Sequence, residues 1–421
     1  MRDVRMQGFA ERADVEQVEA FLRAHTAPLP AEEVPLRACA GRVLAQDVRA
    51  EFDVPGFPRA SMDGYAVRGE DTFGASAYEP VELEVLGETL PGRSFAGLLR
   101  KGQAVRAMTG APLPDGADAV VMAEVCRERA SRVEVCEAVA PRKHVGAIGE
   151  DVRRGDLVLP RGRRLRPQDA GLLASIGVAR PGCVRRPRVA LVITGDELLP
   201  AGSRPQGVRI VDSNSVVLEA LVVRDGGELL PFELLPDRPE RIRAALEDAR
   251  ADVTLVSGGS SVGREDFAPR LLAELGSLDF HGISMRPSSP AGVGRIGSRF
   301  VFLLPGNPVS CLCAYEFFAG PTLRALGLRP RSWPHRRVTL PLARKLASAV
   351  GRTDYVRVAI ESGRVVPIGT SGASILSSTV RAAGCVIVPR ELEGMPEGAS
   401  VEVLLYDDEP PGDPDAGSAG G

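Results

Sequence analysis

The chain has 421 residues, a length that suggests about two to four domains. Hydrophobic residues make up 44% of it and charged residues 25%, which excludes a fully disordered chain. The formal net charge of −3 argues against a protein that binds nucleic acid or anionic membranes by general charge attraction. The sequence has no apolar run of about 18 residues and no signal-peptide core, so we expect a cytoplasmic protein without a membrane span.

The cysteines and histidines do not indicate a zinc or disulfide framework. The seven cysteines are dispersed without a CxxC pair, and the four histidines form neither HxxxH nor HExxH. Free thiols are therefore expected, and a zinc enzyme is not.

The first part of the chain predicts a helical domain with an inserted β domain. Apolar residues at helical spacing predict a helix over 13–24, and a second helix is expected over 34–44. The next segment predicts short strands over 81–86, 104–108, 119–123 and 132–136.

A further helix is predicted over 168–176. We therefore expect residues 1–52 and 146–186 to form one helical and linker domain, into which residues 53–145 are inserted as a β domain.

Strands then alternate with helices over residues 187–328. The predicted strands are 189–194, 229–235, 253–256 and 299–304, and the predicted helices are 214–223, 238–249, 267–275 and 308–326. This alternation indicates βαβ units and a doubly wound, largely parallel sheet. Strand-like sequence returns over 335–407, which predicts a C-terminal β domain. The polar residues 408–421 are expected to be a disordered tail. The fold class is α/β plus all-β in a multidomain chain.

Two loops that follow strands of this sheet have anion-binding character. Residues 257–263 (SGGSSVG) combine glycines that let backbone N–H groups approach an oxyanion with hydroxyl donors. Residues 305–310 (PGNPVS) place Pro308 in a first helical turn, where the following N–H groups are unpaired. Either loop alone is explained as an ordinary tight turn, but both at one sheet edge favour an anion site.

Four acids follow strands at the same edge: Asp196, Glu197, Asp237 and Asp266. Acids beside a phosphate site repel the ligand unless a cation bridges them, which Mg²⁺ does with one or two carboxylates and phosphate oxygens. Helix capping is an alternative for Asp237 and for Asp266.

Other segments carry no distinct chemistry by themselves. Residues 61–66, 108–112 and 149–151 are rich in turn formers and are explained as turns. The sequence shows no Ser/His/Asp or Cys/His arrangement, no Walker A motif and no GxGxxG motif.

Together these segments resemble the molybdopterin molybdenumtransferase family, which includes bacterial MoeA and the E domain of gephyrin. The matching runs, in the family's order, are 54–67 (VPGFPRASMDGYAV), 108–124 (MTGAPLPDGADAVVMAE), 149–151 (GED), 194–198 (TGDEL), 212–214 (DSN), 257–266 (SGGSSVGRED) and 304–310 (LPGNPVS). One such motif would be weak evidence, whereas this ordered set is specific.

The resemblance implies an elongated homodimer with four domains per subunit. In this family the α/β domain binds the pterin nucleotide, and the inserted β domain of the other subunit closes the cleft. Adenylylated molybdopterin and molybdate are the substrates, Mg²⁺ assists, and AMP leaves as molybdenum is placed on the dithiolene.

The resemblance also implies the roles of particular residues. The catalytic set is Asp63, Thr109, Glu197, Asp237 and Asp266. Glu197 and Asp266 are assigned to the metal, and Asp63 and Thr109 act across the subunit interface. The substrate-binding set is Asp151, Ser257, Gly258, Gly259, Ser260, Ser261, Arg286, Ser289, Pro305, Gly306, Asn307, Pro308 and Ser310. Because carboxylates are poor partners for molybdate, the oxyanion is expected to rest on Arg, Ser and backbone N–H groups.

One segment departs from the family pattern. The family usually has Lys-Pro-Gly-Lys-Pro where this chain has Arg286-Pro287-Ser288-Ser289-Pro290. Arg286 keeps the first charge, but Ser289 removes the second, which is expected to cost about 1–3 kcal/mol of anion binding. A second hypothesis is therefore a non-catalytic carrier of molybdopterin or molybdenum cofactor. A third, a nucleotide pyrophosphatase, leaves the motifs at 54–67 and 108–124 unused.

Overall fold

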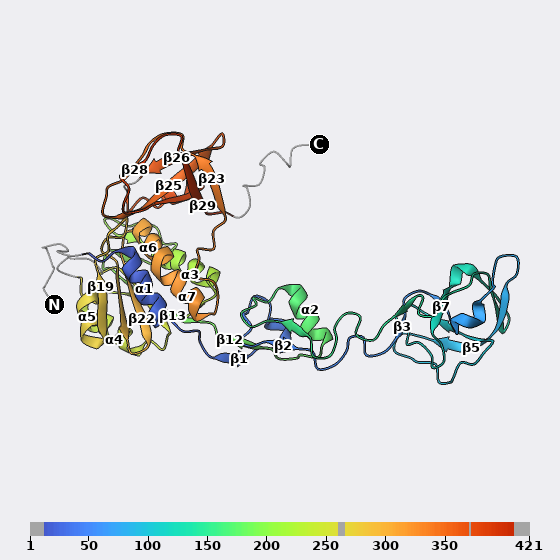
Figure 1. Cartoon of the computed structure of the whole chain (residues 1–421). Coiled ribbons are helices and arrows are strands. Elements are labelled where there is room, and N and C mark those ends of the chain that lie inside the picture. Colours follow the sequence, from blue (N-terminus) through green and yellow to red (C-terminus); the bar gives the residue numbers. More distant parts are fainter. Residues whose placement is uncertain (1–11, 260–265, 370–371, 408–421) are drawn as a thin grey trace. The chain divides into compact units, whose positions relative to one another are not determined.

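The computed structural model describes residues 12–259, 266–369 and 372–407 (Figure 1). The chain divides into two compact units. The first, called the body here, contains the residues up to Glu32 and those from Val184 onward. The second, called the insert, runs from Glu33 to Cys183. None of the helices in the described residues has both the length and the apolar character that crossing a membrane requires.

The described part of the body contains a seven-stranded sheet in the order β16-β13-β18-β22-β21-β19, with β17 also paired to β13. Its strands are β13 (Arg188–Thr194), β16 (Glu228–Leu229), β17 (Leu234–Leu235), β18 (Val253–Ser257), β19 (Ser277–His281), β21 (Gly292–Ile296) and β22 (Arg299–Leu304). All are parallel except β19 and β21, which form an antiparallel edge. The predicted doubly wound α/β domain is confirmed, and β13, β18 and β22 end at one edge of the sheet.

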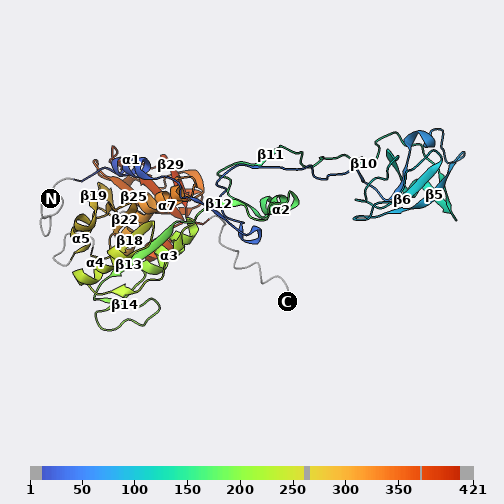
Figure 2. The same cartoon turned by 90° about the horizontal axis from the view of Figure 1, so that it is seen from below.

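Helices cover both faces of this sheet (Figures 1 and 2). They are α1 (Val15–His25), α3 (Asn214–Arg224), α4 (Pro239–Asp248), α5 (Ala268–Leu275), α6 (Pro308–Ala314) and α7 (Gly320–Leu326). Successive strand residues point to opposite faces. Leu191 and Ile193 of β13 therefore pack with α1, α3, α6 and α7, whereas Val192 packs with α4 and α5.

Two expected helices differ from the sequence analysis. The helix predicted over 308–326 is α6 and α7 joined by the π-helical turn η4 (Tyr315–Ala319). The helix expected over 34–44 is only the 3₁₀ turn η1 (Leu36–Ala38). That segment is not helical because its amides bond elsewhere: the N–H groups of Gly41 and Leu44 donate to the carbonyl groups of Leu165 and Arg163.

Helix α1 also packs elsewhere than expected. Contrary to the expected domain of residues 1–52 and 146–186, Val15, Val18 and Leu22 of α1 belong to the core of the body. Phe21 makes an edge-to-face contact with Phe280 of β19, with ring centroids 5.3 Å apart. The apolar face of α1 is therefore buried by the α/β sheet and its helices.

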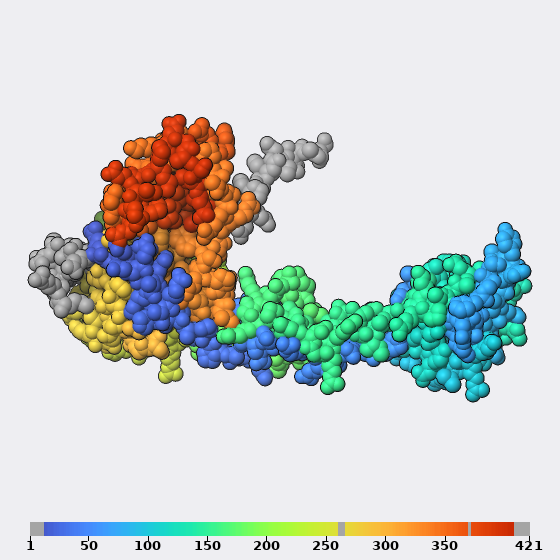
Figure 3. Space-filling view, in the orientation of Figure 1, coloured from blue at the N-terminus to red at the C-terminus, as the bar shows by residue number. Residues whose placement is uncertain are grey.

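The C-terminal part of the body is a second, six-stranded sheet in the described residues, ordered β20-β25-β27-β29-β23 with β26 on β25. Its strands are β20 (Met285–Arg286), β23 (Arg337–Pro341), β25 (Thr353–Glu361), β26 (Arg364–Gly369), β27 (Gly384–Val388) and β29 (Ser400–Leu405). Tyr355, Cys385 and Leu404 of this sheet lie in the same apolar core as the α/β helices. The sheet, in red, accordingly lies directly on the α/β layer in the space-filling view (Figure 3).

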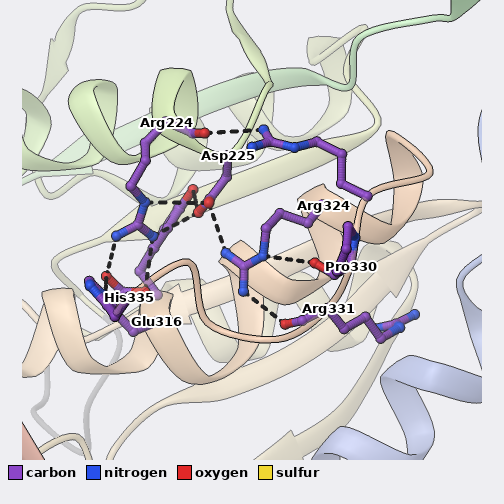
Figure 4. A network of polar contacts seen from close by, with 9 residues as sticks. Arg224, Asp225, Glu316, Arg324, Pro330, Arg331 and His335 are labelled. Atoms are coloured by element: carbon purple, nitrogen blue, oxygen red, sulfur yellow. Dashed lines mark hydrogen bonds and ion pairs between the residues drawn. The ribbon is translucent and has the colours of Figure 1, made fainter. Parts of the chain in front are cut away.

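A buried charge network strengthens this junction (Figure 4). Arg224, at the end of α3, donates to both carboxylate oxygens of Glu316 at 2.6 and 2.9 Å. Asp225 accepts from Arg224 at 2.9 Å and from Arg324 at 2.8 Å. His335, which leads into the C-terminal sheet, places Nε2 3.3 Å from Glu316. The network therefore joins α3, η4, α7 and the C-terminal sheet.

The insert contains separate apolar cores. Its described residues form a six-stranded sheet in the order β7-β4-β6-β5-β9-β8. The strands are β4 (Gly64–Val67), β5 (Val81–Thr89), β6 (Gln103–Ala107), β7 (Ala119–Met122), β8 (Cys126–Arg129) and β9 (Arg132–Val135). Another core forms around α2 (Pro167–Ser175), with residues between Val34 and Ala50 and between Val152 and Cys183.

Shorter elements complete the chain. They are β1 (Ala31–Glu33), β2 (Val48–Arg49), β3 (Arg59–Ala60), η2 (Gly69–Thr72), η3 (Ala123–Val125), β10 (Val145–Gly146), β11 (Leu157–Leu159), β12 (Gly182–Val184), β14 (Leu198–Leu199), β15 (Ile210–Val211), β24 (Leu346–Ala347), α8 (Ser377–Val380) and β28 (Gly394–Met395). The predicted tail at 408–421 lies outside the described residues.

Candidate functional site

A cavity of about 980 Å³ opens at the sheet edge where β13, β18 and β22 end. Its described lining residues come from the loops after these strands and after β17, from the segment 210–214, and from Pro290 and Ser374. Among the residues predicted for the site, those that line it are Glu197, Asp237, Ser257, Gly258, Gly259, Asp266, Pro305, Gly306, Asn307 and Pro308. The structure therefore brings together segments that are far apart in the chain.

The glycine-rich loop forms one wall of the cavity. Gly258 and Gly259 have φ of +96° and +54°, which glycine adopts without strain. A Cβ atom on Gly258 would lie only 2.2 Å from the carbonyl oxygen of Thr194, so the loop needs glycine for close approach to β13. Ser260 and Ser261, also predicted for the site, lie outside the described residues.

Asn214 connects two of the loops. Its Nδ2 donates to the Ser257 hydroxyl at 2.9 Å and to the Gly306 carbonyl at 2.8 Å. Ser257 is 2% exposed, and its Oγ lies 3.8 Å from the buried thiol of Cys311, whose pKa burial raises to about 12. The Ser257 hydroxyl is therefore engaged with protein groups, and the Cys311 thiol stays protonated.

The PGNP turn lines the cavity, but its first helical N–H groups are not all free, contrary to expectation. The N–H of Val309 donates to the carbonyl of Ala373 at 2.9 Å. Ser310 is buried and does not appear in the described lining; its carbonyl accepts a hydrogen bond from the Ser288 hydroxyl. The loop before α8 thereby reaches the site, and Ser374 from this loop lines the cavity.

Three of the four acids expected at this edge, Glu197, Asp237 and Asp266, line the cavity, whereas Asp196 is not in the described lining. The Asp196 and Asp237 loops are joined by reciprocal bonds, since the N–H of each donates to the carboxylate of the other at 3.3 Å. Oδ1 of Asp237 is buried and has no hydrogen-bond partner among the described residues. Neither Asp237 nor Asp266 occupies an N-cap position, because Arg238 precedes α4 and Phe267 precedes α5. Neither acid is therefore the N-cap residue of the helix that follows it.

These acids suit a divalent cation shared with a phosphate ligand. No group of three or more His, Cys, Asp or Glu side chains that could hold a metal by itself is present in the described part of the chain. Mg²⁺, however, is commonly bound by one or two carboxylates and completed by substrate phosphates and water. Glu197, Asp266 and the unpartnered Oδ1 of Asp237 line the cavity and match that donor set.

The lining contains no Lys or Arg among the described residues. The Arg286 guanidinium forms an ion pair with Asp354, a fully buried acid that also accepts from the Ser348 hydroxyl at 2.8 Å. Ser289 is absent from the described lining, and its buried hydroxyl has no partner among the described residues. The segment from Arg286 to Pro290 thus contributes only Pro290 to the described lining.

Three predicted site residues belong to the insert. Oδ1 of Asp63 accepts from the Thr109 N–H at 2.7 Å and from the Thr109 hydroxyl at 2.8 Å. These two donors lower the pKa of Asp63. Asp151 lies in another turn, where its N–H donates to the Val54 carbonyl at 3.1 Å. Asp63 and Thr109 therefore form one unit, and Asp151 is separate from them.

Comparison with known proteins assigns the family. Residues 13–177 match the MoeA N-terminal region (domain I and II), residues 190–325 a probable molybdopterin binding domain, and residues 339–406 the MoeA C-terminal region (domain IV). The chain is 35% identical over 385 residues to a putative molybdopterin biosynthesis protein of Methanocaldococcus jannaschii, a match covering 89% of this chain and 92% of that protein. The chain belongs to the MoeA family.

Other members agree with this assignment. A protein named molybdopterin molybdenumtransferase from Haemophilus influenzae is 32% identical, over 89% of this chain and 94% of that protein. A crystal structure of a MoeA protein from Pyrococcus horikoshii aligns with a TM-score of 0.82 at 33% identity, over 94% of this chain and 100% of that one. The resemblance to molybdopterin molybdenumtransferases is thus confirmed, and family membership places this MoeA-type chain in molybdenum cofactor biosynthesis.

The sequence analysis did not assign a role to several residues that line the cavity. The polar ones are Thr194, Asp212, Ser213, Asn214 and Ser374. Thr194 and the segment 212–214 lie within quoted motifs, so their position after strands was a usable signal. Ser374 had no such signal, because it reaches the cavity from the loop between β26 and α8.

Proposed function

We propose that this chain inserts molybdenum from molybdate into adenylylated molybdopterin and releases AMP. The observation that carries the proposal is the cavity of about 980 Å³ in a MoeA-type body, which a glycine turn and three predicted catalytic acids line together. A volume of this size accommodates a small-molecule ligand. We place the reaction in the cytoplasm, where the seven free cysteines remain reduced.

The cavity residues divide into two sets by chemistry. Gly258, Gly259 and Gly306 expose backbone to the phosphate groups without side-chain obstruction. Glu197, Asp237 and Asp266 would hold Mg²⁺, which would offset the charge on the phosphate oxygens. With that ion bound, the acids would position the phosphate link that is cleaved, and the backbone of the glycine turn would lie beside the AMP group that leaves.

We further propose that the insert of a second subunit completes the site in a homodimer. The Asp63–Thr109 pair is flanked in sequence by Met62 and Met108, which are 45% and 40% exposed, and Phe57 nearby is 43% exposed. Exposed apolar side chains beside an ordered acid-hydroxyl pair are typical of a surface that another chain covers.

The test is AMP release from adenylylated molybdopterin with Mg²⁺ and molybdate. Glu197→Gln keeps the side-chain shape but removes the charge, so we expect AMP release to fall about 100-fold. Glu240→Gln, on the exposed side of α4, is the matched control and should retain full activity. If the wild-type chain releases no AMP, or if Glu197→Gln matches the control, the proposal fails.

A second candidate function is a carrier that binds the cofactor without inserting metal. The absence of Lys and Arg from the described lining favours it, as does the neutral Ser289. In that case the wild-type chain would bind molybdopterin without turnover, and Ser289→Lys would restore AMP release. Turnover by the wild-type chain rejects the carrier hypothesis.

A further inference from the structure

Thr194, the last residue of β13, has an unusual environment for a hydroxyl group. It is 3% exposed and lines the cavity, yet its Oγ1 has no hydrogen-bond partner among the described residues. Buried hydroxyls normally have a partner, because losing hydration without replacement is unfavourable. A bound ligand is one means of supplying that partner.

The glycine loop leaves this hydroxyl uncovered. A Cβ atom on Gly258 would lie 3.0 Å from Oγ1 of Thr194, and one on Gly259 would lie 3.3 Å from it. Side chains at these positions would therefore crowd the hydroxyl. Ser257, one of the hydroxyl donors predicted in this loop, accepts from Nδ2 of Asn214 at 2.9 Å and lies 3.8 Å from the Cys311 thiol.

The charge of the cavity indicates what the hydroxyl binds. Glu197, Asp237 and Asp266 offer acceptor oxygens to the cavity, whereas a hydroxyl can donate a hydrogen bond to an oxyanion. We propose that the Thr194 hydroxyl donates to a phosphate oxygen of the nucleotide substrate beside the Gly258–Gly259 turn. This inference rests on the proposed function and adds a ligand-binding residue to it.

The test is calorimetric binding of ADP, used as a stable diphosphate nucleotide, in the presence of Mg²⁺. Thr194→Val keeps the branched shape and removes the hydroxyl, and we expect its Kd for ADP to rise about 10-fold. Thr194→Ser keeps the donor and should stay within about 2-fold of wild type. Adenosine lacks phosphate, so its affinity for Thr194→Val and Thr194→Ser should equal its affinity for the wild-type chain.

Thr254→Val is the matched control. Thr254 lies on the adjacent strand β18, is 0% exposed and has an Oγ1 without a partner among the described residues, but it is not in the described cavity lining. Its ADP affinity should equal that of wild type. Thermal unfolding of both valine variants should match or exceed wild type, because each loses an unsatisfied hydroxyl.

The outcomes separate the two proposals. If the wild-type chain binds neither ADP nor adenylylated molybdopterin, both the proposed function and the role of Thr194 are rejected. If the wild-type chain binds ADP and Thr194→Val binds it as Thr254→Val does, only the role of Thr194 is rejected. Equal loss of affinity in Thr194→Val and Thr194→Ser also overturns it, because the packing and not the hydroxyl would then be responsible.

Discussion

The ionisation of Asp63, a predicted site residue, is favoured by a single neighbouring residue, Thr109. Its carboxylate accepts both the N–H and the hydroxyl of Thr109, and these donors favour the ionised form. The pKa of Asp63 is therefore lowered, first by the N–H and then by the hydroxyl. A group with a lowered pKa stabilises the fold above its unfolded pKa, and this contribution disappears as the pH falls through the folded value.

Thr109→Val should raise the pKa of Asp63 only part of the way to its ordinary value. The hydroxyl donor is lost, but the backbone N–H remains. An NMR titration of the Asp63 carboxyl group measures the change directly. Thr109→Ser retains both donors and should titrate like wild type, whereas an unchanged titration in Thr109→Val would show that the hydroxyl bond is not formed in solution.

A comparison of Gly258 with Gly202 separates the backbone strain that an added methyl group causes at positive φ from its steric clash with neighbouring atoms. Both have positive φ, +96° and +80°, but a Cβ atom on Gly258 would meet the Thr194 carbonyl oxygen at 2.2 Å and one on Gly202 would meet nothing within 4 Å. We expect Gly202→Ala to cost about 1 kcal/mol and Gly258→Ala about 3 kcal/mol or more. Urea unfolding followed by the fluorescence of Trp333, the sole tryptophan, measures both. Equal costs would contradict the close approach of the loop to β13.

At the scale of elements, the junction of α3, η4 and the C-terminal sheet depends on Glu316. Burial alone would raise the pKa of Glu316, but hydrogen bonds with His335 and Arg224 lower it to about 2. Because the ordinary value is near 4.5, Glu316 stabilises the fold fully above pH 4.5, and this stability is lost as the pH falls toward about 2.

Glu316→Gln should remove part of the acid dependence of unfolding. The shift of Glu316 corresponds to roughly 3 kcal/mol, so the variant should be destabilised by about 2–3 kcal/mol at pH 7 and differ less from wild type near pH 2. Urea unfolding across this pH range is the measurement. Glu402→Gln is the control, since Glu402 is 54% exposed in its pair with Arg337 and should matter little. A constant difference at all pH values would contradict the assignment.

Local sequence patterns predicted the elements whose apolar periodicity agrees with their packing. The strand expected over 299–304 is β22, and the helix expected over 238–249 is α4. Strands β19 and β21 were not predicted. Gly292 and Gly294 give β21 a sequence that is not typical of a strand. Gly294 is required by its neighbour, since a Cβ atom there would lie 2.1 Å from the Ser277 carbonyl oxygen.

The site, too, has parts that local sequence patterns predict and parts that depend on contacts between distant residues. The loops after β13, β18 and β22 could be placed together because parallel strands share an edge. The position of Arg286 could not be predicted, because its partner Asp354 lies 68 residues away, on the neighbouring strand β25. Long-range pairs of this kind are set by tertiary packing, which local patterns do not contain.

At the scale of the whole molecule, none of the apolar clusters in the described residues contains members from both the body and the insert. One cluster of the body includes α/β helices together with Tyr355, Cys385 and Leu404, so the α/β layer and the C-terminal sheet share a core. The insert has its own clusters, one of which surrounds Leu173 of α2. A shared core favours cooperative unfolding, whereas separate cores allow separate transitions.

We therefore expect the body and the insert to unfold in distinct steps. Trp333 packs edge-to-face on Phe317, with centroids 5.0 Å apart, so its fluorescence reports on the body alone. Leu173→Ala and Leu218→Ala each remove a fully buried side chain and should cost about 2–5 kcal/mol, the first in the insert and the second in the body.

In urea, Leu218→Ala should lower the midpoint of the Trp333 transition. Leu173→Ala should leave that midpoint unchanged and instead lower the midpoint of a second transition in far-ultraviolet circular dichroism. A Trp333 midpoint that falls equally in both variants would show that the two units unfold as one.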